Sequence, residues 1–444
     1  MSALDAIEPE LPEGADRTRS LSNVHRSIPV SSSRFFIRRL LAFIGPGYLV
    51  AVGYMDPGNW ATDIAGGAQF AYLLLSVVVI ASLLAIYLQS LAAQLGIATG
   101  KDLAQLCASS YKPSVRIFLW LSAEVAIVAC DLAEVLGAAI AFNLLFHIPL
   151  IIGVLITALD VLLVLALQHK GFRWIEMLVI SLIVTMTVIF IILISMSSPQ
   201  WADVFKGCIP SPLILTHAAM LTVALGILGA TVMPHNLYFH SAIIQTRRFG
   251  STFAEKKEAI KLAIIDNAVA LSIALFVNAA ILIVAAATFY VHHQRSVGDI
   301  QTAFELLTPI LGTTLAVPLF AVALLASGQN STLTGTLAGQ VIMEGFTSFR
   351  IQPWLRRMIS RMLAIVPAAI IIWIEGNKGI NSLMIWSQVI LSIQLPMAVI
   401  PLVQFTADRK KMGGHHVSRP VMILGWFSAI TILVLNVYLV GISL

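Results

Sequence analysis

The chain has 444 residues, of which 58% are hydrophobic and only 11% are charged, and its mean hydropathy is +0.91. Because a soluble domain carries about 25% charged residues, this composition excludes an ordinary soluble protein and indicates an integral membrane protein. The net charge of +5 comes from Lys and Arg residues that alternate with apolar runs and form no contiguous patch, so no nucleic-acid binding is predicted.

Residues 1–39 come first in chain order. They are polar and contain six arginines, which predicts a disordered cytosolic tail without the apolar core of a signal peptide. From Leu40 onward, apolar runs near or above the roughly 20 residues needed to cross a bilayer recur to the end of the chain. Eleven membrane-spanning helices are predicted, at 40–68, 71–97, 114–146, 149–168, 174–197, 214–245, 261–290, 313–346, 357–374, 381–405 and 421–443.

The distribution of basic residues predicts how these spans are oriented. With the N-terminus placed in the cytoplasm, 24 of the 27 Lys and Arg residues fall on the cytoplasmic side, and the opposite side receives Lys206, Arg295 and Lys378. Because cytoplasmic loops are enriched in Lys and Arg, the N-terminus is expected inside. An odd number of spans then places the C-terminus outside. The expected location is the cell (inner or plasma) membrane.

Two predicted spans are interrupted by short polar breaks. Residues 56–59 (Asp-Pro-Gly-Asn) interrupt the first span, and residues 233–236 (Met-Pro-His-Asn) interrupt the sixth. A proline removes a backbone hydrogen bond and disfavours helix in the residue before it. Inside a bilayer the freed carbonyl groups cannot bond to water, so such a break persists only beside a cavity or a bound ligand.

The positions of the breaks predict the domain organisation. In a core of ten spans, the broken helices are the first members of two groups of five, and the second group enters the membrane with the opposite orientation. Corresponding broken helices in an inverted repeat indicate a transporter site near the midplane. We therefore expect a tail at 1–39, five-helix repeats at 40–199 and 213–406, and an additional helix at 421–443.

The first break carries a carboxylate. Asp56 is costly at the centre of a bilayer unless it is paired or coordinates a cation. As an alternative, Asp56 could simply cap the half-helix that starts at Pro57. A Ser or Thr would cap that helix without an intramembrane charge, so a functional carboxylate is favoured. Asn59, three residues on, is expected to present its amide oxygen to the same pocket.

The third span carries an acidic stripe. At about 100° per residue, Glu124, Asp131 and Glu134 fall on one side of the helix. Such a stripe does not suit a lipid-facing surface and indicates a proton or ion path. Arg356 and Arg357, at the start of the ninth span, are candidate counter-charges. The alternative interpretation is a set of structural salt bridges.

The second break carries a thioether. A methionine in an apolar helix is usually core filler, but Met233 lies beside Pro234 in the break. A thioether is a soft ligand, favoured by transition metals and of little use to Mg²⁺ or Ca²⁺. Together with one carboxylate, one amide and a few backbone carbonyls, it predicts a moderate-affinity site for Mn²⁺ or Fe²⁺. His235 is a second ligand, a proton carrier or a hydrogen-bonded interior histidine.

These residues resemble those of the natural resistance-associated macrophage protein (Nramp) family of divalent metal–proton symporters. The resemblance covers nearly all of 40–443 and is carried by residues 56–59, 131–134 (Asp-Leu-Ala-Glu), 229–236 (Gly-Ala-Thr-Val-Met-Pro-His-Asn) and 387–388 (Ser-Gln). It implies an all-α, leucine-transporter-like fold, in which spans one, two, six and seven form a mobile bundle that rocks against a scaffold.

The resemblance also implies a function and its residues. The expected activity is proton-coupled import of Mn²⁺, and also Fe²⁺, Cd²⁺ and Co²⁺, by a monomer in the lipid bilayer without a bound cofactor. Relatives that carry Mg²⁺ lack the methionine, so the transition-metal branch is indicated. The implied metal ligands are Asp56, Asn59, Met233, the Ala230 carbonyl and, in some conformations, the Gly53 carbonyl and Gln388. The implied proton-linked residues are His235, Glu124, Asp131, Glu134, Arg356 and Arg357.

Three other classes of protein are considered. A sodium-coupled amino-acid or amine transporter of the same fold could use free amides at the broken helices, but Met233 beside His235 fits it poorly. An enzyme is not expected, because the chain lacks a G-x-S-x-G, H-E-x-x-H or phosphate-binding glycine motif and its acids have no nearby nucleophile. The three cysteines form no CxxC pair, so no disulfide framework and no zinc or iron–sulfur site is predicted. A passive channel would need a ring of repeated ligands, which nothing in the sequence suggests.

Overall fold

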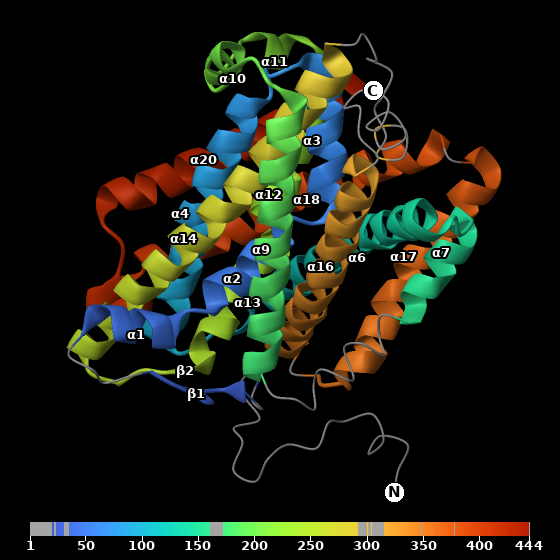
Figure 1. The fold of residues 1–444 in the computed structure, drawn as a ribbon. Coiled ribbons are helices and arrows are strands. Elements are labelled where there is room, and N and C mark those ends of the chain that lie inside the picture. The colour runs from blue at the N-terminus through green and yellow to red at the C-terminus, as the bar shows by residue number, and fades with distance from the viewer. Residues whose placement is uncertain are drawn as a thin grey trace, which may run out of the picture.

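The structure is a computed structural model that describes residues 20–21, 24–30, 35–159, 172–291, 300, 303, 315–347, 349–376 and 378–443. Within these residues the chain is almost wholly helical, with one two-stranded pairing at one end of the molecule (Figure 1). The expected all-α membrane fold is confirmed.

The pair β1–β2 is the only sheet in the described residues, and the other elements are helices. The first half contains β1 (Ile28–Pro29), α1 (Phe36–Phe43), α2 (Pro46–Gly53), α3 (Pro57–Phe70), α4 (Leu75–Thr99), α5 (Leu103–Ser110), α6 (Pro113–Phe146), α7 (Leu150–Ile156), η2 (Thr157–Leu159), α9 (Phe172–Ser197) and α10 (Trp201–Gly207). The second half contains α11 (Leu213–Thr216), α12 (Ala218–Val232), α13 (Pro234–Ile243), η3 (Ile244–Thr246), β2 (Arg247–Arg248), α14 (Phe253–Ala285), the π-helix η4 (Ala286–Tyr290), α16 (Ala316–Thr347), α17 (Pro353–Glu375), α18 (Lys378–Ala407), α19 (Arg409–Met412), η5 (Gly413–His415) and α20 (Arg419–Ser443).

Nine helical segments of the described chain are long and apolar enough to cross a membrane, or ten if the bent pair α1–α2 is one span. The fourth predicted span, 149–168, is seen as α7 and η2, and residues 160–171 lie outside the described residues. The total of eleven spans therefore stays a prediction.

The first predicted span, 40–68, differs from the structure at its start. Residues 36–43 form the separate helix α1, which is bent by 48° from α2. The bend falls at Gly45, whose φ of 144° suits glycine and strains other residues, and Pro46 occupies the first position of α2. The first span is therefore made of α2 and α3.

Both predicted breaks are present. α2 ends at Gly53 and α3 begins at Pro57, while α12 ends at Val232 and α13 begins at Pro234. Each proline occupies the first position of its helix, where a backbone N–H would have no helical partner anyway. Met233, between α12 and α13, has a φ of 31°, which residues with a side chain seldom adopt.

The broken helices lie at the centre of the molecule. In Figure 1, α7 and α17 lie at one side and α20 at the other, with α2–α3 and α12–α13 between them. α3 packs along α14, α12 along α18, and α6 along α16. The approach of α12 to α18 requires glycine, because a Cβ atom at Gly229 would meet backbone atoms of Gln388 and Ser392. Protein therefore surrounds both breaks.

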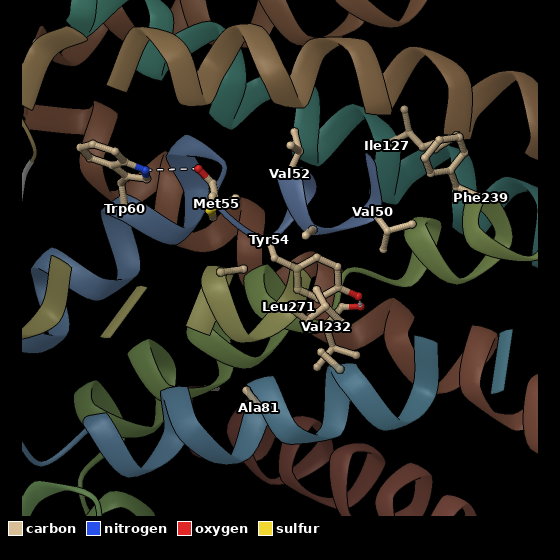
Figure 2. Close-up of a cluster of buried hydrophobic side chains, with 14 of the residues drawn as sticks. Val50, Val52, Tyr54, Met55, Trp60, Ala81, Ile127, Val232, Phe239 and Leu271 are labelled. Atoms are coloured by element: carbon tan, nitrogen blue, oxygen red, sulfur yellow. Dashed lines mark hydrogen bonds between the residues drawn. The ribbon is translucent and has the colours of Figure 1, made fainter. Parts of the chain in front are cut away.

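Apolar side chains fill the space around the first break (Figure 2). Val50, Val52, Tyr54 and Met55 are each at most 1% exposed. Trp60 is also fully buried, and its indole N–H donates to the Met55 carbonyl oxygen at 3.3 Å. A packed apolar core therefore surrounds the backbone groups of the first break that lack helical hydrogen bonds.

Candidate metal site

Asp56 lies at the first break and is the N-cap of α3. Its Oδ1 accepts the backbone N–H of Asn59 at 2.9 Å and the Asn59 side-chain amide at 2.8 Å. Both side chains are fully buried. The capping role considered from the sequence is therefore present and uses Oδ1. Oδ2 lies 3.9 Å from the Cys130 thiol, which is a weak donor.

Asn59 connects the two breaks. Its amide nitrogen donates to the Ala230 carbonyl oxygen at 3.1 Å as well as to Asp56. Its oxygen lies 3.4 Å from the Thr231 hydroxyl and 3.4 Å from the Asn278 amide nitrogen. The neutral amide NH₂ group of Asn59, and not the amide oxygen expected from the sequence, therefore lies between Asp56 Oδ1 and the Ala230 carbonyl oxygen. A cation would suit the place between these two oxygen atoms.

Met233 faces the end of α2. The residue is fully buried, and its Sδ is 3.6 Å from the amide nitrogen of Asn236. A Cβ atom built on Gly53 would lie 3.4 Å from the same sulfur, so Gly53 and Met233 are neighbours across the breaks. Cys130 and Leu391 complete the small apolar cluster around Met233.

Gln388 approaches the first break from α18. A side chain at Gly58 would meet the Gln388 amide group, so the glycine makes room for it. The amide nitrogen donates to Ser387 at 2.9 Å, whereas Oε1 is buried without a hydrogen-bond partner in the described residues. A buried acceptor of this kind normally has a partner, which a bound cation would supply.

The six ligands expected from the family resemblance therefore lie around the two breaks. The described residues contain no group of three or more His, Cys, Asp and Glu side chains arranged to hold a metal. The site has a different composition, with one carboxylate, two amides, one thioether and backbone carbonyls. Such a mixed set binds less tightly than a cluster of charged ligands and suits an ion that must leave again.

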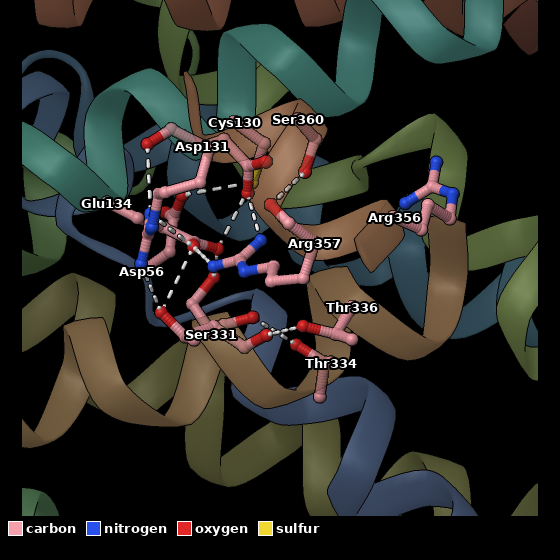
Figure 3. Close-up of polar contacts among 12 residues, drawn as sticks. Asp56, Cys130, Asp131, Glu134, Ser331, Thr334, Thr336, Arg356, Arg357 and Ser360 are labelled. Carbon is pink, nitrogen blue, oxygen red and sulfur yellow. Dashed lines mark hydrogen bonds and ion pairs between the residues drawn. The ribbon is translucent and has the colours of Figure 1, made fainter. Parts of the chain in front are cut away.

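The acidic stripe of α6 meets basic residues of α17 (Figure 3). Arg357 forms ion pairs with Asp131 and, at 2.8 Å, with Glu134. Glu134 also accepts the Ser331 hydroxyl at 2.5 Å. All three charged side chains are at most 1% exposed. Arg361 lies 3.4 Å from Glu134 and was not expected, although its position four residues after Arg357 places it on the same helix face.

Glu124 lies apart from this cluster, nearer the N-terminal end of α6. Its carboxylate pairs with Arg356 at 2.7 Å and accepts the Trp120 indole N–H at 3.1 Å. Both expected counter-charges are therefore in place. The contacts by themselves fit structural salt bridges as well as a proton path.

Cys130 lies between the first break and the acidic cluster. Its Sγ is 3.9 Å from Asp56 Oδ2 and 3.8 Å from Glu134 Oε1. In the sequence this cysteine has no cysteine partner nearby and was not predicted to belong to the site. Its position four residues before Glu134 could have indicated that it lies beside that carboxylate, because residues at this spacing share a helix face. The Asp56 carboxylate and the ion-pair cluster are thus separated by one thiol.

A chain of hydrogen bonds closes the space between α2 and α13. His240 Nδ1 lies 3.0 Å from Gln89 Oε1, and the Gln89 amide nitrogen is 2.5 Å from the Tyr54 hydroxyl. That hydroxyl lies 3.2 Å from the Val232 carbonyl oxygen. His235, in the first turn of α13, is 2% exposed, and its Nδ1 has no hydrogen-bond partner in the described residues.

A second closure holds the start of α2. The buried Arg247 guanidinium donates to the carbonyl oxygens of Phe43 at 2.9 Å and Ile44 at 2.7 Å. It also pairs with Glu176 of α9 at 2.7 Å. Asp266 of α14 accepts the backbone N–H of Gly47 at 2.7 Å, which satisfies an otherwise unpaired donor of α2. The end of the molecule that carries β1 and β2 is closed.

Comparison with known proteins agrees with this architecture. A family model described as natural resistance-associated macrophage protein-like matches residues 47–441. The divalent metal cation transporter MntH of Listeria monocytogenes serotype 4a is 57% identical over 425 residues, covering 96% of this chain and 95% of the relative. The MntH of Bradyrhizobium diazoefficiens is 52% identical over 445 residues, covering 99% of each.

Solved structures show the same relationship. The manganese transporter of Eremococcus coleocola superposes with a TM-score of 0.87 at 42% identity, covering 94% of this chain and 90% of that one. Mhp1, a nucleobase-cation-symport-1 family transporter, has a TM-score of 0.59 at 13% identity, covering 90% and 91%. The latter likeness shows a shared fold, and the leucine-transporter-like fold expected from the sequence is confirmed.

The fold and the paired broken helices are those of a multi-pass membrane transporter. The chain belongs to the Nramp family, as the family match and the relatives above 50% identity show, and this is a family of transporters and not of enzymes.

The ion-pair cluster predicts a stability effect. Arg357→Met leaves the Asp131 and Glu134 carboxylates without their shared cation, and we expect destabilisation by about 3–5 kcal/mol. The measurement is the apparent melting temperature of the purified protein in detergent. Arg356→Met is the matched control, because its partner Glu124 is 27% exposed and can turn to solvent. Equal effects of the two substitutions would contradict the prediction.

Proposed function

We propose that the chain imports divalent transition-metal ions into the cytoplasm by alternating access, with protons as the coupling ions. Mn²⁺ is the proposed main substrate, and Fe²⁺, Co²⁺ and Cd²⁺ are also accepted. Metal transport is supported by membership in the Nramp family. Relatives of the chain are known as a divalent metal cation transporter and a manganese transporter, which supports the choice of substrate.

The observation that carries this proposal is the fully buried Asp56 carboxylate at the meeting point of the two breaks. A carboxylate in the membrane interior must be neutralised by a partner. The described contacts of Asp56 are to a backbone amide, a side-chain amide and a thiol, with no cationic side chain among them. A divalent cation held by Asp56, Asn59, Met233 and the Ala230 carbonyl would supply the missing positive charge, with the Gly53 carbonyl and Gln388 joining in some conformations.

Met233 supports the choice of a transition metal. Hard ions such as Mg²⁺ and Ca²⁺ prefer oxygen ligands and would gain little from a sulfur contact. The rival amino-acid or amine transporter gives no role to this thioether. No contact of the described site favours that reading.

Proton transfer is proposed to follow the α6 stripe. Asp131 and Glu134 are separate from the metal ligands and are linked to Asp56 only through the Cys130 thiol among the contacts of the described residues. A metal ion and a proton can therefore occupy different groups. His235, Glu124, Arg356 and Arg357 are proposed to complete the network.

The proposed topology places the closed end in the cytoplasm. α1, β1 and β2 lie at that end (Figure 1), and most basic residues fall on the same side by the charge distribution. In alternating access, α2 and α13 would part there and release the metal. A monomer in the bilayer is the proposed functional unit.

Asp56→Ala should remove metal transport, because the site loses its anionic ligand and neutral donors must compete with full hydration. We expect Mn²⁺ affinity to fall by about 100-fold or more, equivalent to about 2.7 kcal/mol. The measurement is Mn²⁺ uptake into proteoliposomes at matched protein amounts. Asp203→Ala, at a carboxylate exposed in α10, is the control and should transport normally. Wild-type uptake by Asp56→Ala would remove Asp56 from the site.

Asp131→Asn should impair proton flux more than metal binding, because Asp131 lies outside the broken helices. The measurements are metal-driven acidification of the proteoliposome interior, followed with a pH-sensitive dye, and equilibrium Mn²⁺ affinity. We expect proton flux to fall by about tenfold while affinity changes by less than about threefold. A loss of affinity as large as that of Asp56→Ala would show that the two ions share one path.

Met233→Ala should change selectivity. Water can replace the sulfur, so Mn²⁺ uptake should persist in part, Cd²⁺ affinity should fall by about tenfold, and Ca²⁺ should begin to compete. The measurement is Mn²⁺ and Cd²⁺ uptake under millimolar Ca²⁺. Met384→Ala, at a buried methionine of the α18 core, is the matched control. Unchanged Cd²⁺ preference with Ca²⁺ still excluded would identify Met233 as core filler.

A further inference from the structure

Part of the N-terminal tail takes a defined position across the closed end of the molecule. β1 pairs in parallel with β2, so that Ile28 lies opposite Arg247 and Pro29 opposite Arg248. Figure 1 shows this pair below α2 and α13, at the end that holds α1. Residues 24–30 of the segment expected to be a disordered tail are therefore attached to the chain that directly follows α13.

Several contacts reinforce this attachment. The Arg26 backbone N–H donates to the Gln245 carbonyl oxygen at 3.0 Å, and the Arg26 guanidinium donates to the Phe249 carbonyl oxygen. In return, Arg248 Nε donates to the Arg26 carbonyl oxygen at 3.1 Å. Ile28 is 5% exposed. These contacts bind residues 24–30 to the end of the second broken helix.

Leu21, which lies three residues before Val24, is held by a different element of the structure. Its backbone N–H donates to Glu344 Oε2 of α16 at 3.0 Å. Its side chain is 6% exposed and belongs to the main apolar core. Glu344 is itself 7% exposed and is oriented by the Gln340 amide at 2.8 Å. Leu21 is therefore buried in the main core, with its backbone N–H bound to α16.

The two attachments join elements that alternating access requires to separate. α13 follows the second break and belongs to the mobile bundle, whereas α16 is the eighth predicted span and belongs to the scaffold. We propose that Leu21 together with residues 24–30, named here the strap, latches the closed cytoplasmic end by tying α13 to α16. This inference rests on the proposed alternating-access function and adds a regulatory device to it.

The strap releases at Leu21 when the cytoplasmic end opens. Residues 24–30 are held by the strand pairing and by contacts from both sides, whereas one hydrogen bond joins Leu21 to α16 among the contacts of the described residues, with the Leu21 side chain buried in the core. The weaker attachment breaks first. The strap then travels with α13, and docking of Leu21 favours the closed state.

The test measures opening directly, without metal or protons. Val50 of α2 is fully buried beside α13 (Figure 2), so Val50→Cys reports opening through its rate of labelling by a water-soluble maleimide. Cys208 is exposed and is replaced by Ser, while Cys107 and Cys130 are buried. In full-length protein, Leu21→Ala should raise the labelling rate by about tenfold, because a buried leucine that holds the closed state is truncated. Deletion of residues 1–30 should raise it at least as much.

Leu119→Ala is the matched control, since Leu119 of α6 is also 6% exposed in the main core and has no contact with the strap among those described. Equal labelling of Leu21→Ala and Leu119→Ala would show general loosening and overturn the proposal. Wild-type labelling of both Leu21→Ala and the deletion would also overturn it. If Leu21→Ala does not fold, Glu344→Gln and the deletion decide by the same readout. Failure of metal uptake, in contrast, would contradict the proposed function without changing these labelling rates.

Discussion

The rest of the structure depends on how backbone carbonyls at the two breaks are satisfied without water. An unpaired carbonyl in the membrane interior is unfavourable by several kcal/mol. Side chains donate to four of these oxygens, from Asn278 to Tyr54 at 2.8 Å, from Ser327 and Trp60 to Met55, from Asn59 to Ala230, and from Tyr54 to Val232. The donors come from α3, α14, α16 and the first break itself. Two of these donors, Asn278 of α14 and Ser327 of α16, belong to helices outside the broken spans, and they help to fix where the carbonyl oxygens of the first break lie.

Electrostatics divides the interior into two parts that differ in charge balance. The α6–α17 cluster sets Asp131 and Glu134 against Arg357 and Arg361, so its charges nearly cancel within the protein. The carboxylate of Asp56 has no such partner among its described contacts. A balanced cluster needs no further charge, whereas an unbalanced carboxylate is stabilised most by a cation bound beside it. Under the proposed function, the transported metal ion would be that cation.

The sequence predicted the features that depend on local chemistry. Proline after Asp56 and after Met233 marked both breaks, and the spacing of acids on α6 marked the stripe that pairs with α17. Features that depend on distant segments were missed. Nothing local to Asn278 or Ser327 shows that each donates to a carbonyl in the first span, and the bend at Gly45 separates α1 from the span it was assigned to. The place of Leu21 on α16 likewise needs the folded partner, because 323 residues separate it from Glu344.

The conformation of Met233 has an evolutionary consequence. A φ of 31° in a residue with a side chain stores about 1–3 kcal/mol of strain, which glycine would relieve. Glycine would also leave a cavity where the fully buried methionine side chain packs, at a cost of about 2–5 kcal/mol. The loss of packing outweighs the relief of strain, so selection for stability alone keeps a large side chain at this position. A strained backbone at the second break can therefore persist without any demand from ion binding.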